Sequence, residues 1–154
     1  MRNEKLLQKY KAEFIEHCNS IMHQKAKEYS PDTKRDDGLE EFYWVAERLG
    51  CSATAHCNHL LHKHLFCISK IENGEYENVT KDFLLEKYGD AYNYYTLAIM
   101  INDKDMSEIP NTTVDLVKQI QKHLLGNYLF KETQKYLLDK YLLQLEIILK
   151  NEEK

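Results

Sequence analysis

Two carboxylates and an amide recur at helical spacing in the stretch FLLEKYGDAYNYYTLAIMI, which covers residues 83–101. On an α-helix, Glu86, Asp90, Asn93 and Leu97 would lie on one face. Two carboxylates one turn apart repel each other unless a positive charge lies between them. Mg²⁺ would supply that charge, because it prefers oxygen ligands and takes only a few of them from the protein. The alternative is a solvated polar face on a surface helix.

A second pair of acidic residues begins the stretch EEFYWVAERLG, which covers residues 40–50. Glu40 or Glu41 would complete a carboxylate cage with Glu86 and Asp90 if the two helices faced each other. The alternative is structural, because glutamates in a first helical turn interact favourably with the helix dipole without any further role.

Histidines are frequent in the next stretch, where His56, His59, His62 and His64 fall within nine positions. They match zinc-ligand spacing only in pairs, and no H-E-x-x-H motif is present, so we do not expect a zinc site. His64 lies in an apolar stripe and must be hydrogen-bonded if it is buried. Either it is a satisfied core residue, or it points with Lys63 into a polar pocket and contacts phosphate oxygens or an activated water.

The composition is that of one globular domain. The chain has 154 residues, of which 43% are hydrophobic and 30% charged. Its formal net charge is −4, and no basic stripe is visible, so we do not expect a nucleic-acid polymer as a partner. An anionic small ligand is compatible with this charge if a bound cation offsets the repulsion.

We expect a cytoplasmic protein without a membrane segment. The N-terminal sequence MRNEKLLQKYKAEF lacks the apolar core of a signal peptide. The longest mostly apolar run, residues 91–101, is about half the length of a membrane span. The cysteines form no C-x-x-C pair and no disulfide-framework spacing, which favours reduced thiols at Cys18, Cys51, Cys57 and Cys67.

Apolar periodicity and helix-end signals predict an all-α fold, a helical bundle of about six helices in a single domain over residues 1–154. The expected helices cover about 3–29, 38–49, 52–74, 80–102, 113–126 and 130–150. Glycines stand at four of the expected boundaries, as helix ends favour, whereas Gly89 falls inside a helix. Close approach of another helix or of a ligand would explain Gly89, as would simple tolerance.

The last expected helix has a wide apolar stripe formed by Leu138, Tyr141, Leu142, Leu145, Ile148 and Leu149. We expect this stripe to complete the bundle; the alternative is an oligomer contact.

The stretch from Lys25 to Asn102 contains four groups of residues whose order is informative. They are Lys25, Lys27 and Tyr29; Phe42, Ala46, Leu49 and Gly50; Lys63, His64, Ile68 and Gly74; and Glu86, Gly89, Asp90, Asn93, Tyr94 and Leu97. In this order they resemble the phage-encoded branch of the all-α, MazG-like nucleoside triphosphate pyrophosphohydrolases. The likeness is greatest to helical domains associated with phage nucleotide modification and with dATP/dGTP diphosphohydrolase activity.

The resemblance implies Mg²⁺-dependent hydrolysis of a nucleotide phosphoanhydride. It implies a four-helix core over about residues 3–102, to which we expect the rest of the chain to add a helical extension over about 112–150. We also expect a homodimer or higher homo-oligomer, in the host cytoplasm if the protein is phage-encoded. The implied roles are metal ligation by Glu40, Glu41, Glu86 and Asp90, catalysis by Lys63 and His64, and substrate contacts from Lys27, Tyr29, Lys63 and Asn93.

The acidic motifs depart from those of the general family, which carries E-x-x-E on one helix and E-x-x-D on the next. Here no carboxylate stands three positions after Glu40 or Glu41, and the second motif is E-x-x-x-D. Two alternatives therefore stay open beside the hydrolase. One is a non-catalytic, sponge-like nucleotide-binding protein on the same scaffold, and the other is a helical protein-interaction module.

Overall fold

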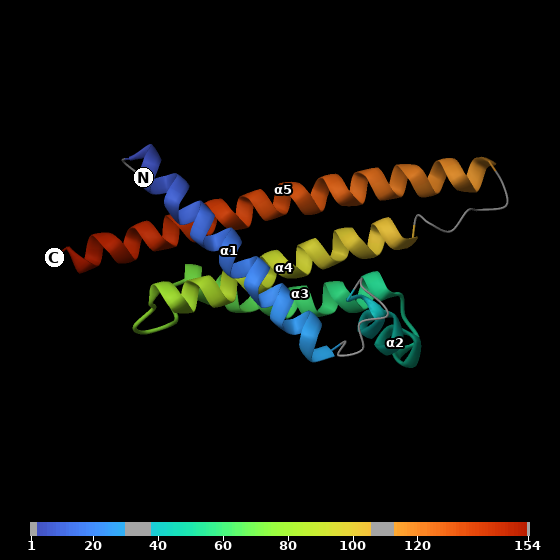
Figure 1. Cartoon of the computed structure of the whole chain (residues 1–154), viewed down its shortest axis with the longest axis horizontal. Coiled ribbons are helices and arrows are strands. Elements are labelled where there is room, and N and C mark those ends of the chain that lie inside the picture. Colours follow the sequence, from blue (N-terminus) through green and yellow to red (C-terminus); the bar gives the residue numbers. More distant parts are fainter. Residues whose placement is uncertain (1–2, 30–37, 106–112, 154) are drawn as a thin grey trace.

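The computed structural model describes residues 3–29, 38–105 and 113–153, and this part of the chain is helical without any strand (Figure 1). The all-α prediction is therefore confirmed. The helices are α1 (Glu4–Tyr29), α2 (Glu40–Leu49), α3 (Ala53–Glu72), α4 (Lys81–Asp105) and α5 (Thr113–Glu152). Within the described ranges, none of these helices is both long and apolar enough to cross a membrane.

Helix α4 is the centre of the bundle, since it packs against α1, α3 and α5. Helix α5 runs antiparallel to α4, and α1 crosses both of them obliquely (Figure 1). Helix α2 packs on α3 near the end of α4. This arrangement surrounds α4 on several sides, which agrees with the mostly apolar run over its residues 91–101.

Local signals in the sequence fix the end of α2 and the beginnings of α3 and α4. Helix α2 ends at Gly50, whose left-handed backbone (φ 68°) favours glycine. Helix α3 begins after Ser52, whose side chain accepts a hydrogen bond from the backbone N–H of Ala55 at 3.1 Å. Thr80 caps α4 in the same way by accepting from the N–H of Phe83 at 3.2 Å.

The core consists of two adjoining clusters. The larger one joins α1, α3, α4 and α5 around the fully buried rings of Phe14, Tyr88 and Tyr141. The smaller one packs α2 and α3 against the second half of α4 around Leu39, Cys57 and Ile101. Residues of the predicted apolar stripe of the last helix belong to the larger cluster, so this stripe completes the bundle as expected.

The prediction of six helices is wrong, because α5 is one helix of 40 residues and Gly126 lies inside it. Gly126 marks a close approach of α4. A Cβ atom at this position would lie 2.9 Å from the Nδ2 atom of Asn102, which donates to Asn127 Oδ1 at 3.2 Å. Tertiary packing thus outweighs the cost of about 1 kcal/mol that a glycine adds inside a helix.

Gly89 marks the crossing of α1 over α4. A Cβ atom there would lie 3.1 Å from the imidazole of His17 and 3.6 Å from the sulfur of Cys18. The Cys18 thiol donates to the carbonyl oxygen of Gly89 at 3.9 Å, and Asn93 Nδ2 donates to the carbonyl oxygen of Cys18 at 3.0 Å. Close approach of another helix is therefore the explanation for Gly89 that the structure supports.

Replacing Gly89 with leucine should separate α1 from α4. Overpacking costs about 1–3 kcal/mol, and we expect a cost near ~3 kcal/mol because a whole helix must move. This cost exceeds the ~1 kcal/mol by which leucine is favoured over glycine inside a helix. We expect the Tm of Gly89→Leu to fall by roughly 4–8 °C in thermal unfolding followed by circular dichroism. The control is Gly126→Ala, where only the end of one flexible side chain must move, and its Tm should change by no more than about 2 °C. A leucine variant as stable as the parent would contradict this account.

Candidate functional site

A cavity of about 510 Å³ lies where α1, α2, α3 and α4 meet. This volume is in the range of pockets that bind small organic molecules. Its lining residues come from the last turns of α1, the start of α2, the middle of α3 and the second half of α4: Ile21, Met22, His23, Lys25, Ala26, Gly38, Glu41, Phe42, Leu60, His64, Asp90, Asn93, Tyr94, Leu97 and Met100.

Most of the cavity wall is apolar or aromatic, and a few polar side chains interrupt it. The imidazole of His64 stacks on the ring of Tyr94, with the ring centroids 5.0 Å apart and the planes at 25°. Phe42 adds a third ring and packs edge-on to Tyr94. Pockets with apolar walls and a small number of placed polar groups are typical of ligand-binding sites.

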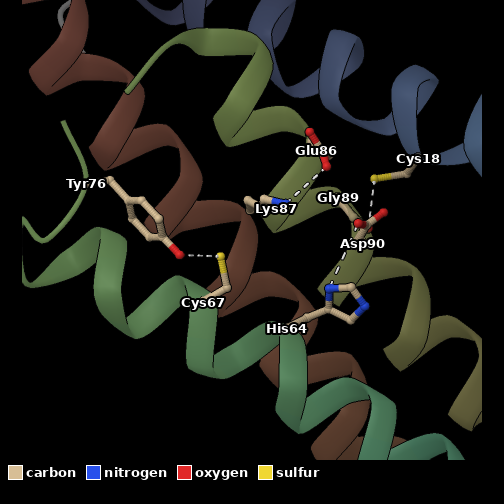
Figure 2. A network of polar contacts seen from close by, with 8 residues as sticks. All are labelled: Cys18, His64, Cys67, Tyr76, Glu86, Lys87, Gly89 and Asp90. Carbon is tan, nitrogen blue, oxygen red and sulfur yellow. Dashed lines mark hydrogen bonds and ion pairs between the residues drawn. The ribbon is translucent and has the colours of Figure 1, made fainter. Parts of the chain in front are cut away.

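Asp90 and His64 face each other across the gap between α4 and α3 (Figure 2). Asp90 Oδ2 lies 3.9 Å from His64 Nδ1, which is too far for a hydrogen bond. The exposed fractions of the two side chains are 30% and 25%, so both are mostly withdrawn from water. Each side chain therefore still has hydrogen-bonding capacity that a ligand in the cavity could use.

Burial opposes charge on both members of this pair. Burial lowers the pKa of His64, and the neighbouring Lys87 and Lys63 lower it further, while Asp90 has the opposite effect. Burial likewise raises the pKa of Asp90, against the opposite effect of His64. At neutral pH the imidazole is thus mainly uncharged, and burial opposes the ionised form of Asp90 more strongly than its charged neighbours favour it.

The register of α4 explains why Asp90 reaches the cavity. Gly89 and Asn93 face the α1 crossing. The adjacent face of the helix, which carries Asp90, Tyr94 and Leu97, lines the cavity. Glu86 lies one turn earlier, where the cavity has ended. Its side chain is 60% exposed, and its Oε1 accepts a hydrogen bond from Lys87 at 3.1 Å (Figure 2).

The structure brings together two of the four predicted metal ligands. Glu41 and Asp90 line the cavity from α2 and α4, whereas Glu40 and Glu86 are exposed residues outside its lining. Carboxylate oxygens suit Mg²⁺. However, the described ranges contain no group of three or more histidine, cysteine, aspartate or glutamate side chains that could hold a metal ion.

Of the other predicted site residues, two line this cavity and two lie outside its lining. His64 and Asn93 line it, although the amide of Asn93 already donates to Cys18. Lys63 is exposed on α3 and Lys27 is exposed near the end of α1, and neither belongs to the lining. The side chain of Tyr29 lies outside the described residues.

The sequence did not indicate the α1 wall of the cavity. Ile21 and Met22 continue the apolar stripe of α1, but they are only half-buried, and His23 and Lys25 follow them at the rim. An apolar stripe that continues beyond the region covered by its neighbours is the signal that would have revealed this wall. The stacking role of Tyr94 on His64 was also missed.

Comparisons of the chain with protein-family models, with curated proteins and with solved structures give no match. The resemblance to the pyrophosphohydrolases therefore stays a prediction, and the function must be argued from the cavity itself.

Asp90→Asn should leave the fold intact and raise its stability. Because the pKa of Asp90 is raised in the folded state, the ionised carboxylate destabilises that state at any pH above its folded pKa. Asparagine has nearly the same shape and no charge. We expect its Tm at pH 7 to be equal to the parent value or higher by up to about 4 °C, as ~1 kcal/mol would give. A large loss of Tm would instead show that Asp90 serves the fold.

Stability should depend on pH through His64. In the unfolded chain its pKa is 6.5, and burial lowers it in the folded state. The unfolded state therefore binds more protons between these two values, and stability is lost as the pH falls through that window. In His64→Gln, Tm measured between about pH 5 and 7.5 should decline less steeply than in the parent. Parallel Tm profiles would contradict the assignment.

Proposed function

We propose that this protein binds a nucleotide, or the nucleoside part of one, in the cavity between α1, α2, α3 and α4. The observation that carries the proposal is the mostly buried carboxylate of Asp90 beside the uncharged, Tyr94-stacked imidazole of His64. A carboxylate in such surroundings favours a ligand edge that donates N–H bonds to it.

A nucleobase fits the chemistry of these walls. It is flat and aromatic, so it can contact Phe42 and Tyr94 while its edge donates to Asp90. The amino and ring N–H groups of a base are the donors that a carboxylate accepts. The stacked ring of His64 also offers its nitrogens for a second polar contact.

The α1 wall supports binding of the phosphate end. His23 and Lys25 both line the cavity near the end of α1, and they place basic groups beside a pocket whose other walls are mostly apolar. Local placement of positive charge allows an anion to bind although the chain as a whole has a formal charge of −4.

Binding can be measured with a panel of ribo- and deoxyribonucleotides and cyclic nucleotides by isothermal titration and thermal shift. A ligand at about 100 times its Kd should raise Tm by roughly 5–10 °C. Asp90→Asn should weaken binding by roughly 10- to 100-fold, because it removes hydrogen bonds to a charged acceptor. Glu86→Gln is the matched control, since it neutralises a carboxylate one turn away that lies outside the cavity, and it should bind as the parent does.

If no nucleotide in the panel binds, the proposal fails and the interaction module is the better interpretation. If Glu86→Gln weakens binding as much as Asp90→Asn, the ligand does not lie where we place it.

Mg²⁺-dependent hydrolysis of a nucleotide phosphoanhydride is the second candidate. The observation that favours it is that Glu41 and Asp90 line one cavity from two different helices. The same panel, assayed with and without Mg²⁺ for released phosphate and pyrophosphate, separates the two candidates. Turnover that requires Mg²⁺ and is lost in Glu41→Gln would favour the hydrolase, whereas binding without turnover would favour the non-catalytic protein.

A further inference from the structure

The outward side of α5 carries a row of exposed apolar side chains. Its members and their exposed fractions are Leu125 (60%), Leu129 (52%), Tyr136 (58%), Leu143 (50%) and Ile147 (47%). At 100° per residue, the five fall within about 40° of one another around the helix axis. We call these five residues the outer row of α5; they lie opposite the side that buries Leu137, Tyr141 and Leu145 in the core.

The outer row is symmetric in sequence about Tyr136. Leu129 stands seven positions before it and Leu143 seven positions after it. Leu125 stands eleven positions before it and Ile147 eleven positions after it. Reversing the direction of the helix about Tyr136 therefore returns apolar residues to the same places.

We propose that the outer row binds a second copy of this chain, with the two α5 helices antiparallel and a two-fold axis at Tyr136. In this arrangement Leu129 of each copy packs against the partner's Leu143, and Leu125 against the partner's Ile147. The row is about 33 Å long, which is enough for a continuous helix-to-helix contact. A two-fold contact is closed, since the same surface serves both copies and none remains for a third.

Charged residues beside the row follow the same symmetry. Glu132 stands four positions before Tyr136 and Lys140 four positions after it, so each Glu132 meets the partner's Lys140. A parallel pairing would instead bring each charge against its own kind. Within one copy, Glu132 pairs with Lys135 at 3.3 Å, while Lys140 pairs with Glu72 at 3.9 Å and lies over the ring of Tyr136, 5.2 Å from its centroid. Both ion pairs are partly exposed, so each contributes little to stability.

The proposal is independent of what the cavity binds, because the outer row and the cavity share no residue. Sedimentation equilibrium of the full chain should give twice the monomer mass of 18.3 kDa at micromolar concentrations. Leu143→Lys should raise the dimer Kd at least tenfold, because the contact buries it twice against the partner's Leu129. Leu124→Lys is the matched control, since Leu124 is 62% exposed but lies off the row, and the dimer should persist.

A charge exchange tests the direction of the pairing. Glu132→Lys alone and Lys140→Glu alone should each weaken the dimer by roughly 3- to 30-fold, because two attractive pairs become repulsive. The double variant should recover the parent Kd. Loss of the Lys140–Glu72 pair cannot account for that recovery, because the double variant loses this pair as well.

Three results would overturn the proposal: a monomeric parent chain, equal loss of dimer in Leu124→Lys and Leu143→Lys, or no recovery in the double variant. Circular dichroism of each variant checks that the helices are intact, so a folding defect is not mistaken for a lost contact.

Discussion

The close crossing of α1 over α4 at Gly89 is the constraint on which the rest of the site depends. The absence of a side chain at Gly89 lets the backbones approach, and bonds through Cys18 and Asn93 fix the two helices in register. Beyond this point α1 continues as the wall of the cavity. The position of Asp90 directly after Gly89 then places its carboxylate beside this crossing and across from His64. The candidate site thus lies at the edge of an ordinary packing contact between two helices.

The electrostatics of the cavity differ from those of a structural ion pair. In a pair that stabilises a fold, attraction raises the histidine pKa and lowers that of the carboxylate, whereas here burial shifts both in the opposite direction. The carboxylate and the imidazole attract each other, but for each of them the cost of burial outweighs that attraction. Such an arrangement is typical of groups that are retained for binding or chemistry.

Local signals allowed much of the fold to be predicted from the sequence, but contacts between helices limited the prediction of the site. Gly50, Ser52 and Thr80 act on their own backbone neighbourhood, so their roles as helix ends were readable. Gly126 carries the same local signal, and only the structure shows that it lies inside α5, beside Asn102 of α4. Glu86 and Asp90 share a helical face as predicted. The cavity reaches Asp90 but not Glu86 because of where α1 and α3 pack on α4. The spacing of residues within α4 does not encode that packing.

The reactivity of the Cys18 thiol depends on whether α1 is packed against α4. It is 1% exposed, and burial raises its pKa to about 12, so in the closed bundle it is both shielded and almost entirely in the unreactive protonated form. Alkylating reagents can modify it only in molecules whose α1 has lifted from α4, which is also the motion that opens one wall of the cavity. The rate at which Cys18 is labelled thus reports how often the cavity opens.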